Sequence, residues 1–224
     1  MKSKKPIFIS IEGGEGAGKT THCLLLEKHL KNKGLKVLLT REPGGTTLSE
    51  SLRKILLHPR TALTPLCELF LYEAARAQHM QEAVLPALKD GKAVICDRFI
   101  DATAAYQGFG RKLSIKLIDT LNKAASLGIE PTVTIYLDIN PAAGIKRARK
   151  LDKDDYGKSG DRIERENVKF HQDVRKGYLV QAKRHPQRVK IVKTQKSIEK
   201  TQELIRKVVD KALKNTGIVK CLKI

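Results

Sequence analysis

A glycine-rich segment near the N-terminus combines a basic side chain and a hydroxyl at fixed spacing. Residues 13–20 fit the pattern glycine, four residues, then glycine-lysine-threonine. Glycines let the backbone turn so that several N–H groups converge on phosphate oxygens. Lys19 is then placed to reach the outer phosphates of a nucleotide, and the Thr20 hydroxyl to ligate Mg²⁺. The predicted nucleotide-binding residues are Gly13, Gly14, Glu15, Gly16, Ala17, Gly18, Lys19, Thr20 and Thr21.

The residues around this segment fit a phosphate-binding loop, which needs a strand before it and a helix after it. Residues 7–11 form an apolar run typical of a buried strand, and residues 20–33 carry apolar side chains at helical spacing. The amino terminus of that helix adds its partial positive charge to the phosphate site. The alternative, a glycine-rich turn with a chance lysine, is disfavoured by this context.

Two further polar clusters follow other predicted strands, where ligands bind on an open α/β sheet. The first, Arg41-Glu42-Pro43-Gly44-Gly45-Thr46, is a tight turn that brings backbone close to a ligand and gives its arginine a rigid base. The second is Asp97-Arg98. A carboxylate there can hold Mg²⁺ through water, and an arginine fork fits a phosphate. A plain surface ion pair is disfavoured directly after the apolar residues 94–96.

A third cluster consists of two pairs of side chains spaced four residues apart in helical segments. Tyr72 and Arg76 share one helix face, and Thr103 and Gln107 share another. An aromatic ring, a guanidinium and a carboxamide together can stack on a nucleobase and read its edge. Taken singly, Tyr72 fits a core aromatic and Gln107 a solvated side chain, so the interpretation depends on the combination.

Strand and helix patterns alternate along the 224 residues, a length that suits one α/β domain. The alternation of apolar strands with helices predicts a parallel sheet covered on both faces. The predicted strands are 6–12, 36–40, 93–97, 132–138 and 189–192.

Several residues mark the predicted helix boundaries. Gly34 and Gly128 stand where helices end, and the pairs Thr64-Pro65 and Asn140-Pro141 fit an N-cap followed by a first-turn proline. The segment 151–160 is polar enough to be a mobile loop between two helices. The last helix, 198–214, is expected to bury Ile198, Ile205, Val208, Val209 and Ala212.

Composition limits the class of protein. No stretch approaches the roughly 20 apolar residues of a membrane span, and the apolar run near the N-terminus is too short for an export signal. The four cysteines are far apart, and three of them fall in apolar helix or strand patterns, so reduced core thiols are expected rather than disulfides or a metal site. These features predict a cytoplasmic protein. The cysteines are Cys23, Cys67, Cys96 and Cys221.

The net charge of +20 is concentrated in the second part of the chain. Residues 1–140 hold 20 Lys and Arg against 14 Asp and Glu, and residues 141–224 hold 24 against 10. Such a balance favours anionic partners. Aromatic residues for base stacking are sparse in the basic part, so a solvated lysine-rich surface explains most of this charge better than nucleic-acid binding does.

Together these motifs resemble those of the bacterial thymidylate kinases over nearly the whole chain. The turn at 41–46 followed in order by Asp97-Arg98 and Tyr106-Gln107-Gly108 is more specific than the phosphate loop, which many nucleotide-hydrolysing proteins share. The resemblance implies the P-loop NTPase fold, with a five-stranded parallel sheet flanked by helices and a helical lid at about 147–163 in a single domain over 1–224. It also implies a homodimer and, with Mg²⁺, phosphoryl transfer from ATP to dTMP, giving dTDP. The other matching pieces are residues 11–21, 74–76 and 161–164.

The resemblance also implies roles for particular residues. Lys19 and the loop amides would hold the ATP phosphates, and Thr20 and Asp97 the Mg²⁺. Arg98 would grip the dTMP phosphate, with Glu15 near that phosphate and the 3′-hydroxyl. The remaining dTMP-binding residues would be Pro43, Tyr72 on the base, Arg76 at thymine O4, Thr103, Tyr106 against the deoxyribose and Gln107 at N3–H.

In the bacterial type of this family the phosphate loop has a glycine where the eukaryotic type has an arginine, and Gly16 agrees with the bacterial type. Arginines of the lid then supply charge to the transition state. The candidates are Arg147, Arg149 and Arg162.

The sequence departs from the family pattern in three places. Tyr72 stands where phenylalanine is usual and Ala102 where serine is common, and the lid is longer and more acidic than usual. The longer lid leaves open which arginine reaches the transferring phosphoryl group. Two alternatives stand beside dTMP kinase. One is another nucleotide or deoxynucleoside kinase of the same fold, and the other is a basic nucleic-acid-binding protein with a vestigial phosphate loop.

Overall fold

The structure is a computed structural model that describes residues 6–150 and 160–216, without the side chains of 149 and 150. Five strands form one sheet in the order β2-β3-β1-β4-β5, and every neighbouring pair is parallel. The predicted α/β fold is therefore confirmed. The strands are β1 (Phe8–Gly13), β2 (Val37–Arg41), β3 (Ala93–Asp97), β4 (Val133–Asp138) and β5 (Val189–Lys193).

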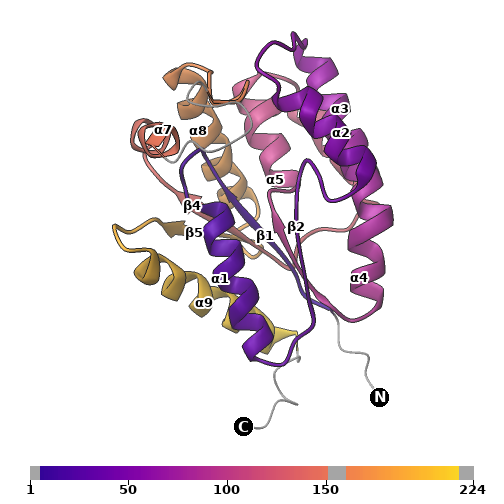
Figure 1. Ribbon diagram of the computed structural model, residues 1–224, viewed down its shortest axis with the longest axis vertical. Coiled ribbons are helices and arrows are strands. Elements are labelled where there is room, and N and C mark those ends of the chain that lie inside the picture. The colour runs from indigo at the N-terminus through magenta and orange to yellow at the C-terminus, as the bar shows by residue number, and fades with distance from the viewer. Residues whose placement is uncertain (1–5, 151–159, 217–224) are drawn as a thin grey trace.

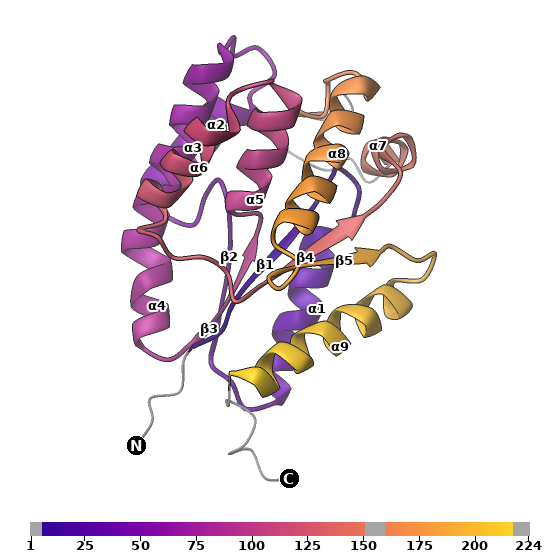
Figure 2. The ribbon, with the colours of Figure 1, turned by 180° about the vertical axis from the view of Figure 1, so that it is seen from behind.

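Helices cover both faces of this sheet (Figures 1 and 2). Helices α1 and α9 lie on one face, and α4, α5 and α8 lie on the other, with α2, α3 and α6 further out. The helices are α1 (Lys19–Asn32), α2 (Thr47–Leu57), α3 (Pro65–His79), α4 (Leu85–Lys89), α5 (Ile100–Thr103), α6 (Ile115–Ala125), α7 (Pro141–Lys150), α8 (Val168–Arg184) and α9 (Ile198–Asn215). Two π-helical segments, η1 (Met80–Val84) and η2 (Ala104–Gly110), continue α3 and α5.

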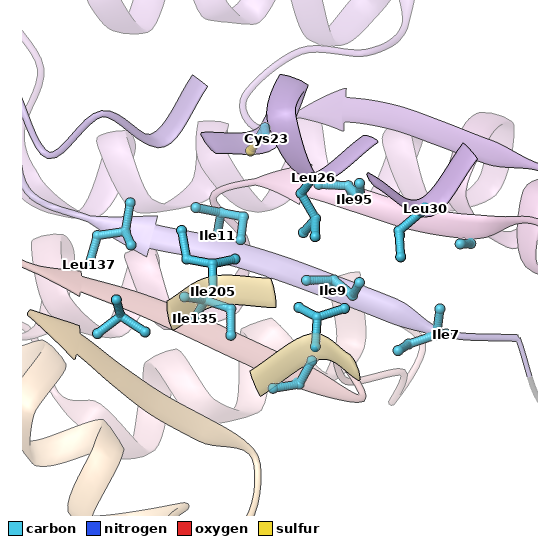
Figure 3. Packing of buried hydrophobic residues seen from close by; sticks show 14 of the residues in the cluster. Ile7, Ile9, Ile11, Cys23, Leu26, Leu30, Ile95, Ile135, Leu137 and Ile205 are labelled. Atoms are coloured by element: carbon cyan, nitrogen blue, oxygen red, sulfur yellow. The ribbon is translucent and has the colours of Figure 1, made fainter. Parts of the chain in front are cut away.

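The hydrophobic core follows the two-residue period of the strands. Ile9 and Ile11 of β1, with Ile7 just before it, point to one face of the sheet, where they pack on α1 and α9 (Figure 3). Phe8 points to the other face and belongs to a second cluster with Met80 and other residues of η1, α4 and β3. Both faces of the central strand are thus buried, as expected of a parallel sheet.

The predicted helix boundaries are confirmed. Gly34 and Gly128 have φ values of 76° and 71° just after α1 and α6. Thr64 accepts a hydrogen bond from the Cys67 amide ahead of the first-turn proline of α3, and Asn140 accepts one from Ala142 at the start of α7. Most of the predicted mobile segment, residues 151–159, lies outside the described residues.

Two details of the predicted core are wrong. Cys67 is exposed, because it lies on the outer side of α3, whereas Cys23 and Cys96 are buried free thiols as expected; Cys221 lies outside the described residues. Ile198 is 50 % exposed, since it stands at the first turn of α9. The buried face of α9 instead runs through Ile205, Val209 and Leu213, each four residues from the next. Val208 and Ala212 are only partly buried.

None of the described helices is both long and apolar enough to span a membrane.

Candidate active site

A cavity of about 630 Å³ opens at the carboxyl ends of β1, β2 and β3, a volume typical of small-molecule sites. These three ends lie at one edge of the sheet because Ile11 and Arg41 are both in register with Asp97. We name the two ends of the cavity after the groups predicted to bind there: the phosphate end is formed by the loop 13–20 with Asp97 and Arg98, and the other is the base end. The base end is formed by Tyr72, Arg76, Thr103 and Gln107.

The phosphate loop connects β1 to α1 as predicted, and Gly18 at the start of α1 has a φ of 86° that favours glycine. The Lys19 ammonium folds back onto the loop and donates a hydrogen bond to the Gly14 carbonyl at 3.1 Å. Burial, together with the nearby Arg98 charge, lowers the pKa of Lys19 from its usual value. An anionic ligand at the loop would offset both effects.

Gly16 lies against the backbone of α7. A Cβ atom on Gly16 would overlap the carbonyl group of Gly144, and Gly16 also has a positive φ of 67°. Conversely, a Cβ on Gly144 would overlap the Glu15 carbonyl oxygen. The phosphate loop and α7 therefore meet backbone to backbone, and this contact leaves no room for a side chain at position 16.

Thr20 and Asp97, the two residues predicted to hold a metal ion, lie side by side. The Thr20 hydroxyl donates a hydrogen bond to Asp97 Oδ2 at 2.8 Å. Two oxygen donors from two different elements, both near the cavity, suit a hard divalent cation that keeps most of its water and takes other ligands from a phosphate.

Arg98 is held in an unusual conformation at the end of β3. Its φ is 72°, rare for a residue with a side chain, and its guanidinium donates to the Gly13 carbonyl at 3.1 Å and to Glu15 at 2.6 Å. Tyr106 also donates to Glu15, at 2.7 Å. Burial alone would raise the pKa of Glu15, but the charges of Arg98 and Lys19 lower it to about 2, so this carboxylate stays ionised.

At the base end, the predicted residues come from α3 and from the α5–η2 segment, and all of them line the cavity. Thr103 and Gln107 face it from a helix that changes to π geometry at Ala104, a change often found at functional sites. Tyr72 is half-buried. Pro43, from the turn after β2, also lines the cavity, and Arg53 donates to its carbonyl at 2.9 Å.

Arg76 is 2 % exposed and is held by buried partners. Its Nε donates to Glu42 at 2.8 Å, and one terminal nitrogen donates to Glu73 at 2.8 Å and to Asn122 at 2.6 Å. Among the described residues, no hydrogen bond uses the other terminal nitrogen, Nη2, and Arg76 lines the cavity. The side chain is thus fixed with a donor left for a ligand.

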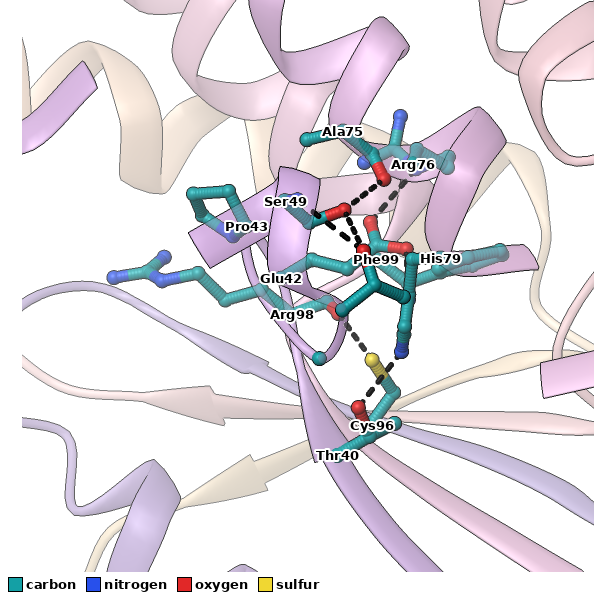
Figure 4. Close-up of polar contacts among 12 residues, drawn as sticks. Thr40, Glu42, Pro43, Ser49, Ala75, Arg76, His79, Cys96, Arg98 and Phe99 are labelled. Carbon is teal, nitrogen blue, oxygen red and sulfur yellow. Dashed lines mark hydrogen bonds and ion pairs between the residues drawn. The ribbon is translucent and has the colours of Figure 1, made fainter. Parts of the chain in front are cut away.

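A chain of hydrogen bonds ties Arg76 back to the sheet (Figure 4). Glu42 also accepts from His79 Nδ1 at 2.9 Å, and His79 Nε2 lies 2.7 Å from the Thr40 hydroxyl. Glu42, His79 and Cys96 are close enough to form a metal cluster, but both ring nitrogens of His79 are already used. This group is therefore better described as a hydrogen-bonded network.

Of the three candidate lid arginines, two can be placed. Arg147 is exposed near the end of α7. Arg162 is mostly buried and donates to the Leu56 carbonyl at 2.8 Å and to Glu68 at 2.6 Å. Arg149 lies in α7, but its side chain is outside the described part.

Comparison with known proteins identifies the family of the chain. A family model described as thymidylate kinase matches residues 11–205, most of the chain. The chain belongs to the thymidylate kinase family. The activity is that of a thymidylate kinase, the phosphorylation of dTMP to dTDP. This activity accounts for the site better than another kinase of the same fold or a nucleic-acid-binding protein would.

Individual thymidylate kinases are similar over nearly their full length. The chain is 47 % identical to one from Gloeobacter violaceus, covering 91 % of this chain and 94 % of the relative. It is 44 % identical to one from Bacillus licheniformis, covering 95 % and 99 %. The crystal structure of thymidylate kinase from Ehrlichia chaffeensis superposes with a TM-score of 0.73 at 32 % identity, covering 91 % and 98 %.

Sequence reasoning missed the buried acids that hold the thymidylate kinase site together. Glu42 was singled out only as part of its turn, and Glu68 and Glu73 not at all. Their spacing carries a partial signal, since Glu68 lies four residues before Tyr72 and Glu73 three before Arg76 on the same helix. The spacing does not predict that these acids are buried.

Proposed function

We propose that this cavity carries out dTMP phosphorylation with dTMP between the base end and Arg98, and ATP on the phosphate loop. The observation that carries the proposal is the convergence of Lys19, Arg98, Arg76 and Gln107 on one cavity. Catalysis of this kind is positioning plus electrostatic stabilisation, without a covalent intermediate. The residues' task is to bring two anionic phosphates together in line and to offset their repulsion.

At the phosphate end, Lys19 exchanges its bond to the Gly14 carbonyl for the ATP phosphates. Arg98 holds the dTMP phosphate, and Glu15 turns from Arg98 toward the 3′-hydroxyl and phosphate of the sugar. Thr20 and Asp97 hold Mg²⁺, which neutralises phosphate charge when bound. Tyr106, whose ring lies 4.8 Å from the Arg98 guanidinium carbon, packs against the deoxyribose.

At the base end, thymine stacks on Tyr72 between Arg76 and Gln107. Arg76 Nη2 donates to thymine O4, and the Gln107 carboxamide pairs with N3–H. Thr103 and Pro43 complete the walls. A buried polar wall that matches these two atoms rejects bases with the opposite pattern, because unpaired buried groups are costly.

The lid, at about 147–163, supplies the remaining positive charge. Because residue 16 is glycine, the phosphate loop carries no arginine at that position. The contact of Gly16 with Gly144 leaves no room for one in this conformation. Arg149 is our first choice for the residue that reaches the transferring phosphoryl group, and Arg162 the second. For Arg162 to do so, it must leave its bond to Glu68.

The protein is proposed to be a homodimer, supported by apolar side chains on its outer helices. Leu66 and Phe70 are four residues apart on α3, and both are exposed, as are Leu48 and Ile55 on the adjoining α2. A second copy of the chain would cover these side chains. Sedimentation velocity should give a dimer, and Phe70→Glu a monomer; a monomeric parent protein would contradict the proposal.

A coupled assay of ADP formation across a panel of nucleoside monophosphates tests the function. We expect dTMP to be used with the highest kcat/KM, and activity to require Mg²⁺. Thr20→Val, which keeps the shape of the side chain but removes the hydroxyl, should raise the Mg²⁺ concentration needed for half-maximal rate. A rate independent of Mg²⁺ would exclude the proposed metal role of Thr20 and Asp97.

A further inference from the structure

Glu68 is a buried carboxylate that joins three distant parts of the chain. It lies in α3 and is 0 % exposed. Its Oε1 accepts from Gln107 Nε2 of η2 at 2.7 Å, and its Oε2 accepts from Arg162 Nη1 at 2.6 Å. Arg111 Nε lies 3.2 Å from both oxygens. We call these four residues, Glu68, Gln107, Arg111 and Arg162, the Glu68 cluster.

The cluster keeps Glu68 ionised. Burial alone would raise the pKa of its carboxyl group, but hydrogen bonds from Arg111 and Gln107 and the positive charges of Arg111 and Arg162 lower the pKa below its usual value. An ionised carboxylate accepts hydrogen bonds and donates none.

This fixes which way the Gln107 carboxamide points. A carboxamide has a donor end and an acceptor end, and the end facing Glu68 must be the NH₂ group. The Gln107 oxygen is then left for other partners. Because Gln107 is 2 % exposed and lines the cavity, that oxygen is presented as an acceptor at the base end.

We propose that Glu68 is a positioning residue that sets base specificity by orienting the Gln107 carboxamide. This inference rests on the proposed contact between Gln107 and the base. With the oxygen presented, the ligand atom it meets must carry a hydrogen, as N3 of thymine and uracil does. N3 of cytosine is an acceptor and would face another acceptor, so cytosine is rejected by a residue that does not touch it.

Replacing the carboxylate by a carboxamide should weaken this preference. In Glu68→Gln the new side chain has one oxygen and one NH₂ group. The oxygen is better placed on the side of Arg162 and the Arg111 terminal nitrogen, which leaves the NH₂ group facing Gln107. Gln107 would then turn over, accept from position 68 and present its own NH₂ group to the base.

The test is the ratio of kcat/KM for dTMP to that for dCMP, measured on one preparation of each variant. The ratio does not depend on the fraction of folded enzyme, so partial loss of stability leaves it unchanged. We expect Glu68→Gln to lower the ratio by at least about tenfold, the scale of one mispaired contact. The ratio should fall because kcat/KM for dCMP rises relative to kcat/KM for dTMP.

Asp101→Asn is the matched control. Asp101 is 2 % exposed and paired with Arg188 at hydrogen-bond distance, but it does not line the cavity. It should lose stability much as Glu68→Gln does while keeping the dTMP-to-dCMP ratio of the parent protein. If Glu68→Gln does not fold, Glu68→Gln combined with Arg111→Gln removes one of the two cations that Glu68 balances and repeats the test.

Gln107→Ala tests the proposed contact between Gln107 and the base separately from the role of Glu68. If Gln107→Ala leaves the ratio unchanged, the proposed contact between Gln107 and the base is wrong, and the inference fails with it. If Gln107→Ala lowers the ratio but Glu68→Gln lowers both kcat/KM values in parallel, Glu68 is only a structural residue. A fall in the ratio in both variants, but not in Asp101→Asn, supports the inference.

Discussion

At the base end of the cavity, polar side chains are held by buried acids behind them, whereas at the phosphate end they bind groups that a substrate can displace. Arg76 and Gln107 are bonded to the buried acids Glu42, Glu73 and Glu68. Within the described part of the chain, Lys19 is hydrogen-bonded only to a loop carbonyl. The base end is therefore preorganised and can select a base by geometry, since little rearrangement is needed on binding.

The phosphate end has to rearrange. Arg98 is paired with Glu15, and Thr20 with Asp97. In the proposed mechanism, each of these contacts is exchanged for a contact with phosphate or metal. Part of the binding free energy is spent in breaking them, and closing the site can then be coupled to the arrival of both nucleotides.

The largest expected effect lies at the preorganised base end. The parent protein should prefer dTMP to dCMP by roughly 10⁴–10⁵ in kcat/KM, the range seen when a site built for hydrogen bonds meets a base that cannot make them. For dUMP, which lacks only a methyl group, the loss should be about 1–3 kcal/mol, or roughly 10- to 200-fold. The coupled assay with the three monophosphates measures both. Comparable kcat/KM for dCMP and dTMP would mean that the base end is not preorganised for thymine.

The next largest effect concerns the lid, which completes the phosphate end. Alanine replacements of Arg147, Arg149 and Arg162, made singly, should include at least one whose kcat falls by about 10³–10⁵, by analogy with other catalytic arginines. Such an arginine engages only on closure, so the Kd of dTMP should change little. Single-turnover kinetics and equilibrium dTMP binding separate the two parameters.

Lys146→Ala is a matched control for the lid, since Lys146 is an exposed cation of the same helix that carries none of the proposed contacts. It should keep the kcat of the parent protein. If all three arginine variants also keep it, the charge in the transition state comes from elsewhere and the lid mechanism is wrong.

The two ends also differed in how well the sequence predicted them. The phosphate loop and Asp97-Arg98 are local patterns at strand ends, and both were predicted with the five strands. The partners of Arg76 were not predicted, because Glu42 and Asn122 lie 34 and 46 residues from it in the sequence. Such contacts depend on how the turn after β2 packs against α3 and α6, which no local pattern encodes. The π-helical turn at 104–110 was also missed, because its geometry depends on packing against α8 and because it contains Gly108 and Gly110, which are poor helix formers.

The two ends of the cavity also differ in the surroundings of a buried acid. Glu68 at the base end contacts arginines, but Glu12, beneath the phosphate end, is hydrogen-bonded to Ser10, the Phe99 amide and Tyr178. No cation among residues 6–150 and 160–216 forms an ion pair with Glu12. Burial, and to a lesser extent the charge of Asp101, raises the pKa of Glu12 to about 7.

The folded protein therefore binds a proton at Glu12 that the unfolded chain releases above about pH 4.5. Its contribution to stability is present below that pH and is lost as the pH rises to about 7, by on the order of 3 kcal/mol. We expect the free energy of unfolding of the parent protein, minus that of Glu12→Gln, to fall between pH 5 and pH 8. Urea denaturation at both pH values measures this difference, and contributions of other groups cancel in it. A difference that does not change with pH would show that Glu12 is ionised in the fold throughout.

The smallest expected effect separates stacking from hydrogen bonding at the base end. Tyr72 is half-buried on the cavity wall, and no hydrogen bond to its hydroxyl occurs among the described residues. If the ring stacks on thymine, Tyr72→Phe keeps the stacking surface and should leave the KM for dTMP within a few fold. Tyr72→Ala removes that surface and should weaken dTMP binding by about 1–3 kcal/mol, the scale of stacking on one base.

Isothermal titration with dTMP gives the affinities of both variants, and thermal unfolding checks that they remain folded. Leu24→Ala is a suitable control for general loss of apolar surface near the cavity, because Leu24 also lines it but lies on α1, beside the phosphate loop rather than at the base end. The comparison between Phe and Ala at position 72 decides the role of the ring. Equal affinities in these two variants would mean that Tyr72 only fills space in the wall, and that Arg76 and Gln107 select the base without it.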